Sequence, residues 1–231
     1  MIDELKRVLN GLQAEEIIAY VAAQYGNRVV FSTSFGVEDQ VLTHMLAAKA
    51  RDTSVFTLET GRLFPETYYI WNRTLERYGM PIRAFYPQAD ALEAMVSDKG
   101  PTSFYESVEN RKECCFIRKI EPLRRAIKGF DVWITGIRAE QSSNREDMGI
   151  VEWDEGNAII KVHPLFHWTL AEVEGFLKAF NVPYNPLHDK GFLSIGCQPC
   201  TRSVGAGEDF RAGRWWWEDK SKKECGLHGE T

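Results

Sequence analysis

The chain has 231 residues, of which 44% are apolar and 26% are charged, and its formal net charge is −5. These values are typical of a globular protein with a sizeable core, and they exclude a chain-wide basic surface for nucleic acid. No apolar run approaches the roughly 20 residues that span a bilayer. The first residues resemble neither a signal peptide nor a transit peptide, so we expect a cytoplasmic protein without a membrane segment.

Short apolar runs alternate with helical patterns over the first half of the chain. An apolar period over residues 3–25 predicts the first helix. The alternation that follows predicts strands at 28–31, 54–58, 82–86 and 131–135, with helices from 36 to about 48 and at 65–78, 89–96 and 112–127. This order predicts an α/β fold, a parallel sheet with helices on both faces.

The remaining chain changes character. Residues 136–149 are a polar loop, 150–162 have the pattern of a hairpin, and 170–180 form an amphipathic helix with Thr169 as its N-cap. From about residue 205 the chain is charged and rich in Gly and Trp. We therefore expect an α/β domain over 1–204 and a loop-rich, mobile functional tail over 205–231.

The turn after the first strand is a candidate anion site. Its hydroxyls and backbone N–H groups stand at a helix N-terminus, which favours phosphate or sulfate, although an ordinary helix cap has the same features. The turn lacks the G-x-x-x-x-G-K pattern of a Walker loop. Its candidate substrate-binding residues are Ser32, Ser34, Gly36, Glu38 and Asp39.

Two later strand ends carry similar features, and the carboxyl ends of parallel strands share one crevice. Thr60, Gly61 and Arg62 follow the strand at 54–58, and Arg138 and Arg145 follow the strand at 131–135. Forked arginine side chains suit phosphate and sulfate. Plain connections and solvated surface charges are the alternatives.

Four of the five cysteines form two close pairs, Cys114-Cys115 and Cys197-x-x-Cys200. This spacing indicates metal binding rather than a disulfide framework. Four thiolates suit either zinc or a [4Fe–4S] cluster, and two adjacent ligands are awkward on one tetrahedral zinc, which favours the cluster. Buried free cysteines are the alternative, but the second pair lies in a turn-rich segment.

The fifth cysteine, Cys225, stands alone near the carboxyl end. Lys222, Lys223 and His228 favour its thiolate, and Gly226 leaves the sulfur approachable. A stray exposed cysteine is the alternative. The charged, Trp-rich run at 211–217 indicates that this tail docks somewhere.

Taken together, these segments resemble the APS/PAPS reductase family, and specifically its iron–sulfur-containing branch that reduces adenylyl sulfate (APS). The resemblance extends in order over nearly the whole chain from Phe31. The segments that carry it are Thr60 to Thr67, Cys114 to Lys119, Gly136 to Arg145, Pro183 to Asp189, Cys197 to Arg202 and Glu224 to His228.

The resemblance implies an adenine-nucleotide hydrolase-like fold, reduction of APS to sulfite in sulfate assimilation, and thioredoxin or a glutaredoxin-like protein as reductant. It implies that the domain over 1–204 binds APS and the cluster, that Cys225 in the tail is the nucleophile, and that Lys119 and His228 are further catalytic residues. Glu59 stands where the family usually has Asp. The implied cluster ligands are Cys114, Cys115, Cys197 and Cys200, and the implied anion contacts are Lys119, Arg138, Arg145, Arg211, Arg214 and His228.

Three rivals stay open on the sequence alone. A PAPS reductase would carry the tail cysteine but usually lacks both cysteine pairs. An ATP pyrophosphatase would want a Ser-Gly-Gly loop, which residues 32–39 do not provide. A zinc-stabilised binding module would tolerate the loss of Cys225. A monomer and a homo-oligomer both stay open.

Overall fold

The computed structural model describes residues 2–141, 148–205 and 207–218. The chain begins with α1 (Ile2–Leu9) and α2 (Ala14–Tyr25), where the sequence predicted a single helical stretch. The break falls at Gly11, whose φ of +83° is a left-handed conformation that a helix does not contain. Glu16 then caps α2, since its carboxylate accepts the N–H of Gln13 at 2.8 Å.

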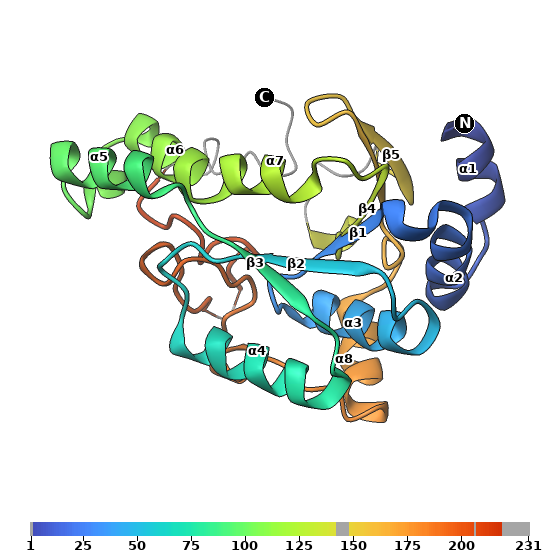
Figure 1. The fold of residues 1–231 in the computed structure, drawn as a ribbon. Coiled ribbons are helices and arrows are strands. Elements are labelled where there is room, and N and C mark those ends of the chain that lie inside the picture. The colour runs from blue at the N-terminus through green and yellow to red at the C-terminus, as the bar shows by residue number, and fades with distance from the viewer. Residues whose placement is uncertain (1, 142–147, 206, 219–231) are drawn as a thin grey trace. The chain divides into compact units, whose positions relative to one another are not determined.

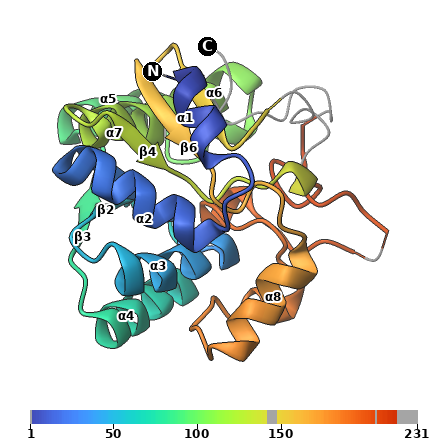
Figure 2. The same cartoon turned by 90° about the vertical axis from the view of Figure 1, so that its right-hand side faces the viewer.

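Six strands form one mostly parallel sheet in the order β3-β2-β1-β4-β6-β5 (Figure 1 and Figure 2). β1 pairs in parallel with β2 and β4, and β4 with β6, whereas β5 and β6 are antiparallel. The predicted parallel sheet and the predicted hairpin are both confirmed. The strands are β1 (Val29–Ser32), β2 (Ser54–Leu58), β3 (Ile82–Phe85), β4 (Val132–Ile134), β5 (Val151–Asp154) and β6 (Ile159–Val162).

Helices connect these strands as predicted. Thr169 caps α8, because its Oγ1 accepts the N–H of Glu172 at 3.2 Å while the Glu172 carboxylate accepts the N–H of Thr169 at 2.7 Å. None of the described helices is long and apolar enough to cross a membrane. The helices are α3 (Val37–Lys49), α4 (Pro65–Tyr78), α5 (Ala89–Lys99), α6 (Val108–Cys115), α7 (Glu121–Ile127) and α8 (Leu170–Ala179).

The helix predicted at 112–127 begins earlier and contains an irregular turn. Ser107 caps α6, since its side chain accepts the N–H of Asn110 at 3.1 Å. A single π-helical stretch, Phe116–Ile120, then joins α6 to α7. Such wide turns shift the direction of side chains within a helix and are frequent at functional sites. This one immediately follows the adjacent cysteine pair.

The chain divides into two units. The first comprises Met1–Thr57, Pro65–Arg83 and Gly129–Leu187. Its apolar core is built from strand residues such as Phe31 and Ile134, together with the inner faces of the helices. Within it α3 packs against both α2 and α8 (Figure 2).

The second unit comprises Leu58–Phe64, Ala84–Lys128 and His188–Thr231. It has a smaller core in which Met95, Phe104 and Trp215 pack with buried cysteines. The expected division into 1–204 and 205–231 stays a prediction.

Candidate functional site

The residues singled out by the sequence fall in both units. Ser32, Ser34, Gly36, Glu38, Asp39 and Arg138 belong to the first unit, whereas Thr60, Gly61, Arg62, the paired cysteines, Lys119, Arg211 and Arg214 belong to the second. Arg145, Cys225 and His228 lie outside the described residues.

The loop after β1 is held by a buried carboxylate. Asp39, in the first turn of α3, accepts the N–H of Ser34 at 2.6 Å and its hydroxyl at 2.7 Å. Burial raises the pKa of Asp39 to about 6, although the hydrogen bonds from Ser34 oppose that rise. Ser32 is also engaged, since its hydroxyl accepts the indole N–H of Trp133 at 2.8 Å. The chain's own contacts therefore shape this loop.

Phe35 adds strain to the same loop. Its φ is +61°, a conformation that a bulky residue rarely adopts. The ring is 1% exposed and stacks on Trp71, with the ring centroids 5.4 Å apart. Aromatic burial therefore compensates the backbone cost and fixes the loop conformation, as is common at ligand-binding turns.

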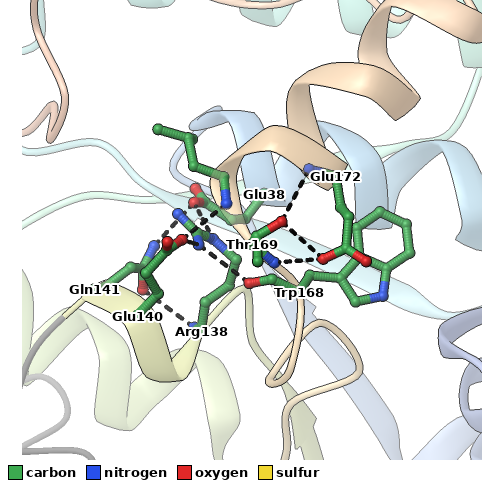
Figure 3. Close-up of polar contacts among 8 residues, drawn as sticks. Glu38, Arg138, Glu140, Gln141, Trp168, Thr169 and Glu172 are labelled. Carbon is green, nitrogen blue, oxygen red and sulfur yellow. Dashed lines mark hydrogen bonds and ion pairs between the residues drawn. The ribbon is translucent and has the colours of Figure 1, made fainter.

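The loop after β4 is organised around Arg138, which is 1% exposed (Figure 3). Its Nε donates to Glu38 at 2.8 Å, and its Nη1 donates to Glu140 at 2.6 Å and to the carbonyl oxygen of Trp168 at 3.2 Å. Glu140 in turn accepts the N–H of Leu170 at 2.8 Å, at the start of α8. Arg138 and Glu140 together thus join the loop after β4 to the first turns of α3 and α8.

In the second unit, the segment after β2 is bound to the C-x-x-C turn. Glu59 accepts the N–H of Gly61 at 2.6 Å, which closes a tight turn at the left-handed Gly61 (φ +71°). The thiol of Cys197 donates to the Thr60 hydroxyl at 3.3 Å, and the N–H of Gln198 donates to the Arg62 carbonyl at 2.8 Å. The predicted substrate segment and the second cysteine pair are therefore neighbours.

All four paired cysteines line one cavity. Cys114 and Cys115 end α6, while Cys197 and Cys200 flank a short 3-10 turn. Burial raises the pKa of Cys200 to about 12, with the nearby Cys197 adding to the rise, and burial also raises the pKa of Cys114. The remaining lining residues are Arg62, Phe104, Arg111, Arg118, Lys119, Arg214 and Trp215.

Three buried donor atoms on these lining residues have no hydrogen-bond partner among the described residues: Arg118 Nε, Arg214 Nε and Trp215 Nε1. A buried donor left without an acceptor costs about 1–3 kcal/mol, so each such atom calls for an explanation. Four cationic side chains besides Arg111, whose charge is paired with Glu218, lie around the four thiols and indicate that the cavity suits an anionic occupant. No three His, Cys, Asp or Glu side chains in the described part of the chain converge as the ligands of a metal ion.

The Trp-rich run docks within the second unit, as the sequence indicated. Trp215 is 1% exposed, and its backbone N–H donates to the backbone carbonyl of Cys200 at 3.2 Å. Arg214 lies so close against Gly196 that a Cβ at position 196 would overlap the guanidinium. Sequence reasoning did not single out Phe104, Arg111 or Trp215 as cavity residues, although the helical spacing of Arg111 three residues before Cys114 was an available signal.

The fold and the cavity together define an α/β protein in which four cysteines line one cavity. Comparison with known families matches residues 28–203 to the phosphoadenosine phosphosulfate reductase domain. The adenosine 5'-phosphosulfate reductase of Burkholderia cepacia is 51% identical over 212 residues, which cover 90% of this chain and 85% of the relative. That of Agrobacterium fabrum is 45% identical over 97% of this chain and 86% of its own.

A solved structure agrees with these relatives. The phosphoadenylyl-sulfate reductase of Candida auris, in a phosphate complex, superposes with a TM-score of 0.75 at 27% identity, covering 88% of this chain and 96% of that one. The chain therefore belongs to the APS/PAPS reductase family, and the expected fold is confirmed.

Proposed function

We propose that this protein reduces APS to sulfite and AMP in sulfate assimilation. The observation that carries the proposal is the cavity shared by both cysteine pairs, because its residues stand beside the strand-end segment Thr60–Arg62. The relatives at 45% and 51% identity are named as reductases of APS. A reaction that consumes reduced thiols suits the cytoplasm.

A [4Fe–4S] cluster is the cofactor we propose, held by Cys114, Cys115, Cys197 and Cys200. Its support is the donor set: four thiols, with cationic side chains and unpartnered N–H donors around them. A cluster spreads its ligands over several irons, so adjacent cysteines need not converge on one ion. When bound, it would supply a compact anionic centre beside Lys119. Because ligation requires thiolates, the raised pKa values of Cys114 and Cys200 make its binding release protons.

The chemistry starts at Cys225 in this proposal. Its thiolate attacks the sulfur of the APS sulfonyl group, the bond from that sulfur to the bridging phosphate oxygen breaks, and AMP leaves with the electron pair. The product is an S-sulfocysteine on Cys225. Negative charge gathers around the transferred group, so cationic side chains lower the barrier. The proposed cations are Lys119, Arg138, Arg145, Arg211, Arg214 and His228.

The remaining proposed substrate contacts are Ser32, Ser34, Gly36, Glu38, Asp39, Thr60, Gly61 and Arg62. In the first unit these residues are already ordered by internal hydrogen bonds. Arg138 forms ion pairs with Glu38 and Glu140, so it would stabilise its loop as well as contact the anion. A preformed loop binds without a cost of ordering, which supports recognition of a nucleotide.

Release of sulfite needs a second thiol. That thiol attacks the Cys225 sulfur, sulfite leaves with the electron pair, and a mixed disulfide forms. If the four paired cysteines hold a cluster, no other thiol remains in the chain, which has five cysteines. A dithiol protein of the thioredoxin or glutaredoxin type would supply the thiol, and its second thiol would resolve the mixed disulfide, so the partner is oxidised by two electrons.

The test is purification without oxygen, followed by iron analysis and assays with APS and PAPS. We expect about four irons per chain, sulfite and AMP from APS, and a sulfonate adduct on the Cys225 peptide when reductant is withheld. Cys225→Ser should bind APS but release no sulfite. An iron-free, colourless protein that turns over APS would remove the cluster from the proposal, and turnover by Cys225→Ser would remove the covalent step.

A further inference from the structure

We propose that the ion pair between Arg111 and Glu218 is the anchor of the tail, a positioning device that fixes the point from which the chain runs on to Cys225. This inference rests on the proposed function of Cys225 and adds two residues that act through it. Neither Arg111 nor Glu218 was singled out by the sequence motifs.

The pair is buried and two-pronged. Arg111 Nε donates to Glu218 Oε1 and Arg111 Nη2 donates to Oε2, both at 2.9 Å. The two side chains are only 1% and 4% exposed. A two-pronged arginine–carboxylate contact fixes the relative orientation of the two side chains as well as their distance. Because both side chains are buried, water does not readily replace either partner.

Arg111 places this anchor beside the cavity that the four paired cysteines line. Arg111 lies on α6, three and four residues before Cys114 and Cys115, so the three share one side of the helix. Its guanidinium also lies 4.8 Å from the centre of the Trp215 ring and lines the cavity. Glu218 is thereby tied to the same helix that presents the first cysteine pair.

The anchor limits the reach of the tail thiol. Cys225 is seven residues beyond Glu218, a span of at most about 25 Å. Without the pair, the nearest upstream contact within the second unit is the Trp217 ring, whose centroid lies 4.5 Å from that of Tyr105. Cys225 is eight residues beyond Trp217, a span of at most about 29 Å, so the volume within reach of the thiol grows about 1.5-fold. The local concentration of the thiol falls accordingly.

Glu218→Gln tests the anchor, and Glu208→Gln is its matched control. Glu208 makes a similar two-pronged pair with Arg202, at 2.8 Å for each contact, but both side chains are 38% exposed. Three quantities are measured on cluster-containing protein: the single-turnover rate of sulfonate transfer to Cys225 at saturating APS, the Kd for APS, and the rate of tryptic cleavage after Arg214, which is 7% exposed.

We expect Glu218→Gln to slow sulfonate transfer about 1.5-fold or more, to leave the Kd for APS unchanged, and to speed cleavage after Arg214 at least tenfold. The control should match the wild type in all three. Glu218→Asp keeps the charge and should give an intermediate transfer rate, which covers the case in which Glu218→Gln does not fold.

Two results would overturn the anchor. One is a transfer rate in Glu218→Gln equal to that of the control, even if cleavage is faster, because the pair would then be structural only. The other is unchanged cleavage after Arg214. Absence of any adduct on Cys225 in the wild type, by contrast, overturns the proposed function and the positioning role with it, whatever the cleavage assay shows.

Discussion

Gly136 lies directly against Asp39: a Cβ at position 136 would come within 2.5 Å of the Asp39 Oδ1 atom and 3.0 Å of the Glu38 Cβ. The loop after β4 can therefore approach the first turn of α3 only because residue 136 has no side chain. That approach allows Arg138, two residues later, to reach Glu38.

Gly136→Ala should destabilise the protein by about 1–3 kcal/mol, because the methyl group overlaps a buried carboxylate that Ser34 holds in place. Denaturant unfolding measures the change. Gly175→Ala is the control, since Gly175 lies within α8 and a Cβ there would meet nothing within 4 Å. Alanine there should stabilise the helix by up to about 1 kcal/mol. Equal effects at the two sites would contradict the close packing at Gly136.

Asp39 should make stability depend on pH. Its pKa is 3.8 ordinarily and about 6 in the folded protein, because burial disfavours the charged form. Between pH 3.8 and about 6, Asp39 is protonated in the folded protein but has lost its proton in the unfolded chain. The contribution of Asp39 is therefore fully present below about pH 4 and is lost as pH rises through about 6, a change of roughly 3 kcal/mol. The free energy of unfolding of the wild type, relative to Asp39→Asn, should fall over this range.

Asp154 supplies a control of opposite sign. Burial alone would raise the pKa of Asp154, but hydrogen bonds from Lys161 and Asn157 bring it below its ordinary value. The stability of the wild type relative to Asp154→Asn should thus be present above about pH 4 and fall as pH decreases further. If both differences run in the same direction with pH, the account of Asp39 is wrong.

Arg138→Ala should lower the free energy of unfolding by about 3–5 kcal/mol, because it leaves the Glu38 carboxylate without its buried arginine partner. Glu140→Ala removes the other carboxylate of the same network, but the Glu140 side chain is 56% exposed, so its loss should cost about 1 kcal/mol or less. Thermal and denaturant unfolding of the two variants measure the contrast. A loss below that of Glu140→Ala would mean that Arg138 is not the centre of the network.

The two classes of cysteine should separate by iron content. Cys200→Ser changes a cavity cysteine and should lower the iron bound to anaerobically purified protein at least tenfold. Cys225→Ser should keep the iron and lose sulfite release. Iron analysis and the absorbance of the two variants measure the bound cluster. A Cys225→Ser variant without iron would place that thiol among the ligands instead.

Much of the fold could be predicted from the sequence. The periods of the apolar residues are local, so they identified the four central strand–helix alternations, and Thr169 with Glu172 is a local capping pattern that the structure contains. The break at Gly11 was missed because its neighbours continue the helical apolar period. The early start of α6 was missed because the cap at Ser107 precedes a strongly polar segment with little periodicity.

The candidate site was predictable only in part. Spacing alone distinguished the two cysteine pairs from Cys225, and the polar strand ends marked Ser34, Thr60 and Arg138. Sequence could not tell that the donors of Ser34 are taken by Asp39. It also could not find Glu218, since its partner Arg111 is 107 residues away.

The sequence by itself determined the order of elements, the family and the residue types for thiol and anion chemistry, because these depend on local periods and on motifs that remain legible in one dimension. Tertiary structure alone decided that the four paired cysteines line one cavity and that Arg138 and Arg111 have buried carboxylate partners. Such contacts join residues far apart in the chain, and their strength comes from burial, which only the packed fold creates.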